Sequence, residues 1–527
     1  MKQNSGQPAW KKWLPWVFFA ACISAWVAYF VTHIGALVDS DMSSEMILGN
    51  ILFQENGFLL TKNWFYSTEI RLLHQQAVFS LLFRLTDDWQ TVRIAGTLIL
   101  YAAYLAAWYY FCCRAGIRKY FPVTGGLLML PLSEAYSYIM LLGAFYIPHV
   151  VLALVIVGLA LGLMQEKKGR MRRSILLMAL SLLAGLGGPR LILVVFAPLG
   201  TLALMRLVLR RSKADAPFVG VTFGACGLAL AGYVINAKVL TRQYNCSFTS
   251  EYTAIRSYSN PASVQIGIPS LSDVKDVALG WLRSLSDDRA GMFRLVALAV
   301  LLAAAAAIIV VLIRRKEASE AQKFSALFGF LSAAWLTLVF LFTDMERNTW
   351  YFVPSLIFLL PAFCAFLQLC PLRHIVALAM TAVLLLCGVR GYDNLALWRE
   401  RTGRISDDTK QVAQFLQDNG YREGYASFWS ANVVTELTDG QVDVWCPLIG
   451  DPQPVTEYIF KPQYISQWLQ PVMHTKRRPE GKVFVLLTAK ENKTATLMEL
   501  PGVSVVYQSD DYVIYDVAEL PEVIPSE

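Results

Sequence analysis

The feature that most constrains this sequence is its series of apolar runs, each about 20 residues long, which is the length needed to cross a bilayer. Charged residues make up only 16% of the 527 residues, against about a quarter in a typical soluble domain. The first run, 14–37, follows Lys11 and Lys12 and is too long for the core of a signal peptide, so we interpret it as a retained span. The sequence therefore predicts a polytopic α-helical membrane protein.

Lysine and arginine residues between the runs predict how the spans are oriented, because basic loops stay in the cytoplasm. The basic clusters at the N-terminus, 114–119, 167–173, 210–213 and 314–316 all fall on one side if the N-terminus is cytoplasmic. We predict eleven spans, at 14–37, 90–113, 121–141, 145–164, 174–188, 190–209, 216–236, 292–313, 324–343, 350–369 and 374–390. The chain is then a multi-pass protein of the cell membrane whose C-terminus lies outside. We attribute its net charge of +7 to the inner clusters and expect no nucleic-acid partner.

Residues 70–85 allow two interpretations, a tilted span or a helix lying at the outer interface. A span here would move every later basic cluster to the outer side, so we favour the interfacial helix.

Two large segments then face outward, the first loop (38–89) and the tail (392–527), with a third at 237–291. The tail predicts a small α/β domain, with a helix over 407–420 and strands at 425–429, 442–446, 482–488 and 503–517, the last with a turn at Ser509-Asp510. Whether Cys246 and Cys446 form disulfides is left open by the sequence.

The inner loops exclude a cytoplasmic nucleotide site. They are about ten residues long or shorter, and none contains a P-loop or a Rossmann glycine pattern. Any chemistry would therefore take place outside, where nucleotide sugars are not generally available. An activated group would have to arrive on a carrier that crosses the membrane, and a lipid phosphate is the obvious carrier.

Three carboxylates, Asp39, Asp41 and Glu45, follow the first span directly. The pattern predicts a helix over 41–56 that ends at Asn56-Gly57, with Asp41 and Glu45 one turn apart on the same face. One interpretation is structural, with Ser40 or Asp41 capping the helix. The other is functional, with a carboxylate acting as a general base toward an acceptor hydroxyl at the outer surface.

The order of these motifs resembles the GT-C class of integral membrane glycosyltransferases, in particular the protein O-mannosyltransferase, aminoarabinose transferase and rhizobial lipopolysaccharide transferase group. The resemblance rests on the aspartate-containing helix after the first span and on the arginine-led second span at 92–116. The Gly-Gly-Pro-Arg segment at 183–199 and the Arg-Tyr-x-x-Pro-like stretch at 346–361 also match. One departure is that Met42 follows Asp41, where many relatives have Asp-Glu.

The resemblance implies a transmembrane GT-C-like domain over 1–391 and an extracytoplasmic α/β domain over 392–527. It implies Asp41, and more weakly Asp39, as catalytic residues. Arg190 and Arg347 would hold the phosphate of the donor, although arginines near span ends also snorkel to lipid headgroups. Further residues that it implies for substrate binding are Glu45, His149 and Tyr351. Glu69 and His74 match a position where some members bind a divalent cation, but residues five apart do not share a helix face well, which favours an ordinary polar patch.

The predicted function is the inverting transfer of a sugar from a polyprenyl-phosphate donor to a hydroxyl of a glycan, lipid or protein acceptor, with membrane lipids as further partners. A ligase or polymerase using a diphosphate-linked glycan is an alternative that the 237–291 loop keeps open. A lipid or glycan transporter is a second alternative, although the paired half-sequence repeats typical of transporters are not evident.

Overall fold

The computed structural model describes residues 10–67, 70–166, 168–209, 216–246, 266–286, 291–402, 407–447, 460, 465–492 and 501–520. The chain divides into two compact units. The first unit comprises Met1–Phe30, Ile99–Val239 and Tyr252–Leu395, and the second comprises Val31–Leu98, Leu240–Glu251 and Ala396–Glu527. The predicted first outer loop therefore belongs to the same unit as the tail, whereas the sequence suggested two successive domains.

Long apolar helices dominate the first unit. Over the described ranges, nine helical stretches are long and apolar enough to cross a membrane. They contain α1 (Trp10–His33), α4 (Trp89–Arg114), α7 (Ile147–Gln165), α9 (Ala197–Leu209), α10 (Ala216–Ile235), α14 (Gly291–Ile313), α15 (Glu320–Phe342), α16 (Val353–Leu369) and α17 (Arg373–Thr402). These helices confirm the predicted fold class, while the side on which each terminus lies stays a prediction.

One of the eleven predicted spans, 121–141, is not a continuous helix, and another, 174–188, is short. The stretch 121–141 forms α5 (Phe121–Leu127), a turn, α6 (Glu134–Tyr136) and a π-helical segment (Ser137–Leu142). Pro131 lacks a backbone N–H and Ser133 caps a new helix by accepting from the Tyr136 N–H, so the helix restarts there. The stretch 174–188 forms α8 (Arg170–Leu186), a continuous helix of 17 residues and about 26 Å, which is at the lower limit for crossing a bilayer.

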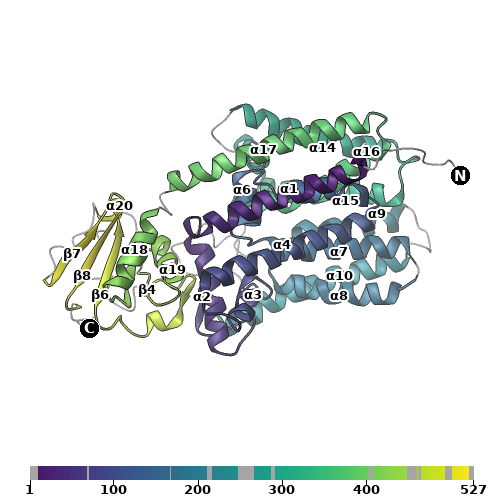
Figure 1. Cartoon of the computed structure of the whole chain (residues 1–527). Helices are drawn as coiled ribbons and strands as arrows, with labels where there is room; N and C mark the ends of the chain where they lie inside the picture. The colour runs from purple at the N-terminus through teal and green to yellow at the C-terminus, as the bar shows by residue number, and fades with distance from the viewer. Residues whose placement is uncertain are drawn as a thin grey trace. The chain divides into compact units, whose positions relative to one another are not determined.

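Small residues let the backbones of α8 and α10 touch. A Cβ atom added at Gly185 would clash with the Ala229 carbonyl, and one added at Gly232 would clash with the Leu182 carbonyl. Such close approach is the usual way in which membrane helices associate. α7, α8 and α10 accordingly lie side by side (Figure 1).

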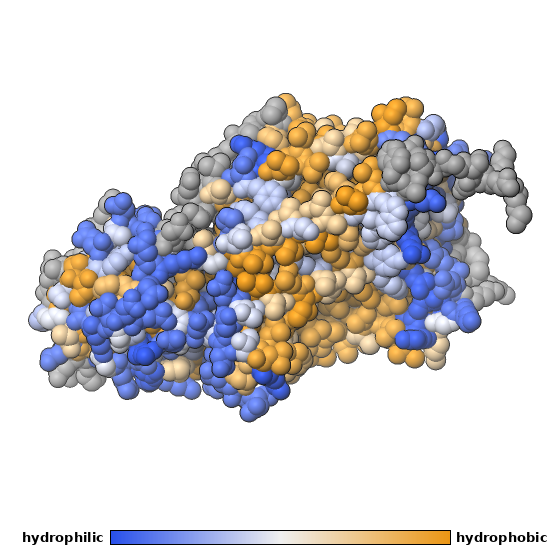
Figure 2. Space-filling model, in the orientation of Figure 1, coloured by the Kyte–Doolittle hydropathy of each residue, from blue (hydrophilic) through white to orange (hydrophobic). Residues whose placement is uncertain are grey.

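Apolar side chains cover the outside of the helices (Figure 2). On α14, for example, Leu295 is 67% exposed and Ile313 is 75% exposed. A soluble protein rarely leaves a continuous apolar surface of this extent in water. The helices of the first unit therefore need lipid around them.

In the second unit, α2 (Ser40–Gln54) forms close to the predicted position, but α3 (Gln75–Leu82) is shorter than the predicted helix at 70–85. His74 has an extended backbone at the N-cap of α3, and the eight residues that follow extend only about 12 Å. α3 is too short to cross the bilayer, so a tilted span is excluded. A position at the outer interface stays a prediction.

A three-stranded sheet joins segments far apart in the sequence. β1 (Trp64–Tyr66), from the first outer loop, pairs in parallel with β2 (Asn245–Cys246) and antiparallel with β5 (Gln470–Pro471). The first loop, the start of the third outer segment and the tail therefore share one sheet within the second unit.

The tail has the predicted α/β character. Its elements are α18 (Asp407–Asp418), β3 (Glu423–Ala426), α19 (Phe428–Leu437), β4 (Asp443–Trp445), β6 (Val483–Thr488), β7 (Val503–Gln508) and β8 (Tyr512–Val517). The strand order is β4-β3-β6-β8-β7, with β3 parallel to β4 and β6 and the remaining pairs antiparallel. α19 is the crossover between the parallel strands β3 and β4, and the sequence did not predict it.

Alternate residues of each strand face the two cores of this sheet. Val444 and Cys446 pack into the core that contains α18 and α19, whereas Trp445 packs into the opposite core. Neither Cys446 nor Cys246 forms a disulfide, and Cys446 is only 2% exposed. Labelling by an impermeant thiol reagent would therefore be a poor test of where the tail lies.

Candidate active site

The first turn of α2 separates the roles of its two aspartates. Asp39 is the N-cap: its backbone is extended, its side chain is fully buried, and its Oδ1 accepts the Met42 N–H at 3.0 Å. This position is one residue before the two capping candidates, Ser40 and Asp41. A carboxylate committed to the backbone in this way is a poor general base, which weakens the catalytic prediction for Asp39.

Asp41 lies in the first turn of α2 and is partly exposed. The backbone carbonyl of Asp41 accepts a hydrogen bond from the Ser44 hydroxyl at 2.7 Å, which helps to hold the backbone of this turn in place. Because Asp39 performs the capping, the structure does not need the Asp41 carboxylate for that purpose. A partly exposed carboxylate on a fixed backbone is the arrangement that a general base requires.

Glu45 lies one turn further along α2 and forms a buried ion pair. Its Oε2 lies 2.9 Å from His74 Nδ1, and its Oε1 lies 3.7 Å from Arg71 Nη1. Burial alone would raise the pKa of Glu45, but the charge and hydrogen bond of His74, with Arg71 and Arg93, hold that pKa below its usual value. Glu45 therefore stays ionised and is engaged in holding His74 beside α2.

The predicted cation site receives no support from these contacts. Glu69 lies outside the described residues, and His74 directs Nδ1 at Glu45. Across the part of the chain that the structure describes, no group of three His, Cys, Asp or Glu side chains could hold a metal ion. His74 fits its role as the ion-pair partner of Glu45 better than that of a metal ligand, and we derive no step through a metal.

In the first unit, Arg190 and His149 meet around a tyrosine. The Arg190 guanidinium lies 4.9 Å from the centre of the Tyr146 ring, and that ring lies 6.2 Å from the ring of His149. His149 Nε2 is 3.4 Å from the Gly187 carbonyl oxygen, within the segment that leads to Arg190. A π-helical segment, Ile192–Phe196, follows directly, and π-helical turns are frequent at functional sites.

Arg347 is engaged by two carboxylates of α13 (Leu271–Arg283). Its Nη2 lies 2.5 Å from Asp273 and its Nη1 lies 3.5 Å from Asp276. Hydrogen bonds from Ser270 and then from Arg347 lower the pKa of Asp273 to about 2. Tyr351, a few residues further on, stacks on Phe340 with ring centres 6.3 Å apart.

The polar pocket around Arg347 has a volume of about 480 Å³. Its charged lining residues are Asp273, Asp276, Asp344, Arg283 and Arg347, so acids outnumber bases. An anionic phosphate is a poor match for such a pocket, which makes Arg347 a weaker candidate than Arg190 for the donor phosphate.

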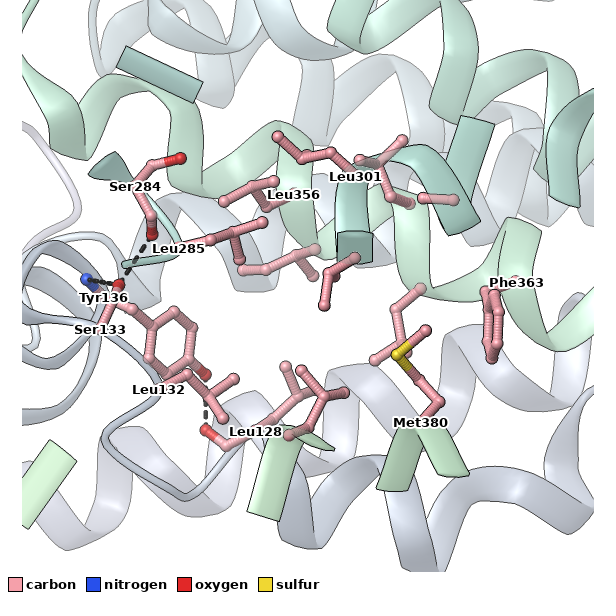
Figure 3. Close-up of a pocket in the computed structure, with 16 residues that line it drawn as sticks. Leu128, Leu132, Ser133, Tyr136, Ser284, Leu285, Leu301, Leu356, Phe363 and Met380 are labelled. Carbon is pink, nitrogen blue, oxygen red and sulfur yellow. Dashed lines mark hydrogen bonds between the residues drawn. The ribbon is translucent and has the colours of Figure 1, made fainter. Parts of the chain in front are cut away.

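An apolar pocket of about 110 Å³ lies among α14, α16 and α17 (Figure 3). Its few polar groups are paired: Ser133 donates to the Ser284 carbonyl at 2.7 Å, and the Tyr136 hydroxyl donates to the Leu128 carbonyl at 2.5 Å. Leucine side chains, with Phe363 and Met380, form most of the remaining wall. This lining suits a hydrocarbon chain and offers nothing to a sugar or a phosphate.

No protein-family model matches the chain, and no curated relative is found for it. Among solved structures, it is similar to ArnT from Cupriavidus metallidurans in the apo state, with a TM-score of 0.56 and 12% identity over 97% of this chain and 99% of that chain. It is also similar to the same protein bound to undecaprenyl phosphate, with a TM-score of 0.54 and 14% identity over 96% and 99% of the two chains.

A third similarity is to the Archaeoglobus fulgidus oligosaccharyltransferase in complex with Zn and sulfate, with 9% identity over 89% of this chain and 68% of that chain. Its TM-score of 0.43 is too low to support an inference. The ArnT structures confirm, at the level of the fold, the resemblance to the GT-C class that the sequence motifs indicated.

Proposed function

We propose that this chain, which has the fold of the GT-C class, is a glycosyltransferase that moves a sugar from a polyprenyl-phosphate donor to an acceptor hydroxyl. The observation that carries the proposal is the likeness over almost the whole chain to ArnT, which has been crystallised with undecaprenyl phosphate. The position of Asp41 in the first turn of α2 adds a residue able to perform the chemistry.

Asp41 is the proposed general base. Its carboxylate accepts the proton of the acceptor hydroxyl while the oxygen of that hydroxyl forms a bond to the anomeric carbon of the sugar. The bond between that carbon and the phosphate oxygen breaks, and polyprenyl phosphate leaves with the electron pair. Attack on the face opposite the leaving phosphate inverts the configuration at the anomeric carbon.

Arg190 is the proposed partner of the donor phosphate. Negative charge grows on the phosphate as the sugar leaves, and a guanidinium stabilises that charge through two parallel hydrogen bonds. The stacking of Arg190 on Tyr146 limits the orientations of the guanidinium, and His149 lies beside the same ring. Arg347 is already paired with Asp273 and Asp276, so its contribution to phosphate binding is expected to be smaller.

The proposal is tested by comparing lipid extracts and surface glycans in a deletion strain, by mass spectrometry. The deletion strain is complemented with the wild-type chain, with Asp41→Asn, or with Asp39→Asn as a matched control that can still cap α2. We expect a polyprenyl-phosphate sugar to accumulate in the deletion strain and with Asp41→Asn, and to be consumed with the wild type and with Asp39→Asn.

The same extracts separate the alternatives. Accumulation of a glycan on a polyprenyl diphosphate would favour the ligase or polymerase. Unchanged lipid-linked sugars in the deletion strain would contradict the transferase. Normal consumption with Asp41→Asn would place the base elsewhere.

A further inference from the structure

Residues of the crossover helix α19 and of α4 hold the backbone on the two sides of Asp41. The Ser40 hydroxyl donates to the Phe428 carbonyl at the start of α19. Asn432 Nδ2, one turn further on, donates to the Ser40 carbonyl at 3.4 Å. On the other side of Asp41, Arg93 Nη2 donates to the Met42 carbonyl at 2.9 Å. The carbonyls of the residues just before and just after the candidate base are therefore both held by side chains from elsewhere in the second unit.

Glu436 of α19 fixes the orientation of the Arg93 guanidinium. Arg93 is only 2% exposed and Glu436 only 6%, and the two form a bidentate pair with Nη2 at 2.7 Å from Oε2 and Nε bonded to Oε1. A buried guanidinium must be paired, because leaving it alone in an apolar surrounding is strongly unfavourable. The hydrogen bond from Arg93 to Met42 therefore depends on a carboxylate supplied by the tail.

A chain of hydrogen bonds fixes the amide of Asn432. Its Nδ2 donates to the carbonyls of Ser40 and Leu469, so its Oδ1 is left to accept from Gln470 Nε2, at 2.7 Å. Gln470 Oε1 must then accept, and the donor facing it at 3.0 Å is His474 Nδ1.

The far end of this chain is an ion pair. His474 Nε2 lies 3.0 Å from both carboxylate oxygens of Asp443, and the His474 ring stacks on Trp445 at 4.1 Å. Burial would raise the pKa of Asp443, but His474 and then Arg477 hold that pKa below its usual value, so the carboxylate accepts. Because Asn432 Nδ2 faces two carbonyls and Asn432 Oδ1 faces Gln470 Nε2, the amides of Gln470 and Asn432 each have one orientation only.

We propose that α19 is a positioning element for the candidate base: Asn432 and Glu436 fix the first turn of α2 and thereby the direction of the Asp41 carboxylate. The inference rests on the proposed function of Asp41, but its structural half can be tested without a substrate. It makes the tail part of the catalytic machinery, acting through the backbone of α2. An error of about 1 Å in the place of a catalytic group can reduce the rate about 100-fold.

The test compares Glu436→Gln with Glu423→Gln in the full-length protein. Glu423 is the matched control, because it also forms a bidentate pair, with Arg477 at 2.5 and 2.7 Å. Within the described residues, it forms no hydrogen bond or ion pair with α2. Hydrogen exchange is measured at the Met42 and Ser43 amides, which bond to Asp39 in the first turn. Turnover and KM are measured with the polyprenyl-phosphate sugar extracted from the deletion strain.

We expect Glu436→Gln to speed amide exchange in the first turn of α2 and to lower kcat about 10- to 100-fold with little change in KM. Glu423→Gln should leave both quantities close to wild type, even where it lowers the melting temperature. If Glu436→Gln does not fold because Arg93 is left unpaired, Arg93→Gln/Glu436→Gln removes both charges and takes its place.

The outcomes distinguish this inference from the proposed function. Wild-type exchange in α2 of a folded Glu436 variant would overturn the positioning role, whatever the activity of Asp41. Faster exchange with unchanged kcat, in a protein that Asp41→Asn inactivates, would overturn it as well, since the base would then tolerate the motion. Full activity of Asp41→Asn would instead remove the proposed function.

Discussion

The carboxylates of α2 and those of α13 are two acidic clusters of similar sequence appearance and opposite physical character. On α2, Asp39 is committed to the helix cap and Glu45 to His74, and both are buried. On α13, Asp273 and Asp276 are partly exposed and neutralise Arg347. The third carboxylate of the first cluster, Asp41, is partly exposed. In the second cluster, Arg347, a candidate ligand of the donor phosphate, is already paired with two aspartates in an ion-pair network.

The function of a charged residue near the end of a span can therefore be inferred only once its interaction partners are known. From the sequence, the same role was predicted for Arg190 and Arg347, since both lie near outer ends of predicted spans. In the structure one stacks on Tyr146 and the other lies between two aspartates. Substitutions in the two clusters should therefore have very different effects.

The largest contrast is expected between Asp41→Asn and Asp273→Asn. Loss of the base should lower turnover by about two to four orders of magnitude at unchanged protein level, because general-base catalysis contributes about that much. Asp273→Asn removes a partly exposed partner of Arg347 and should leave turnover within about threefold. Turnover of the extracted lipid-linked sugar by purified protein measures both. Equal effects of the two substitutions would erase the distinction between the clusters.

The next contrast concerns stability. Glu45→Gln leaves His74 and Arg71 without their buried carboxylate, and breaking such a pair typically costs about 3 to 5 kcal/mol. Asp276→Asn, at the exposed end of the Arg347 network, should change the free energy of unfolding by less than about 0.5 kcal/mol. Thermal unfolding of the detergent-purified protein compares them. A Glu45→Gln variant as stable as Asp276→Asn would mean that the α2 pair contributes nothing.

A smaller contrast separates the two arginines. Arg190→Gln should raise the apparent KM for the lipid-linked sugar about tenfold or more, and Arg190→Lys should restore part of it, since lysine keeps the charge but not the planar fork. Arg347→Gln should raise the KM less than threefold, because its charge is already neutralised. A larger effect at Arg347 than at Arg190 would reverse our assignment of the phosphate ligand.

Much of the fold could be predicted from the sequence, because apolar runs and alternating strands leave strong periodic signals. The strands β6, β7 and β8 and the helix α18 lie where the alternation and the Asn-Gly stop indicated. The prediction of one continuous span at 121–141 was wrong, because composition alone does not reveal that the helix is interrupted at Pro131 and restarts after Ser133. The helix cap of α2 was missed by one residue, which lies within the usual uncertainty of helix boundaries.

The candidate site was predicted in part. Asp41 and Glu45 lie on α2, and His74, at the N-cap of α3, contacts Glu45, as expected of an aspartate-led helix with a neighbouring outer segment. α19 was missed because "YASFW" continues a strand pattern through its aromatic residues, although Ser427 and the Asp439-Gly440 stop are signals of a helix. The pairing of Arg93 with Glu436 joins residues 343 positions apart, and one sequence contains no local signal for it.

The smallest contrast is in the response to acid. The pKa values of Glu45 and Asp273 are both lowered in the folded protein, so each group stabilises the fold above its unfolded pKa. That stability is lost as the pH falls through the folded pKa. For Asp273 the pH window runs from its unfolded pKa of 3.8 down to its folded pKa of about 2, and for Glu45 the window begins at its unfolded pKa of 4.5. Tryptophan fluorescence of the detergent-solubilised chain can follow unfolding between pH 6 and pH 2, at about 0.05 and 0.5 M salt.

Added salt should abolish the contribution of Asp273 to stability, because screening acts on exposed charges, and should leave the contribution of buried Glu45 unchanged. Comparison of the wild type with Asp273→Asn and Glu45→Gln isolates the two contributions. Equal salt sensitivity of both would show that the α2 pair is as open to solvent as the Arg347 network, and the contrast between a buried and an exposed cluster would then fail.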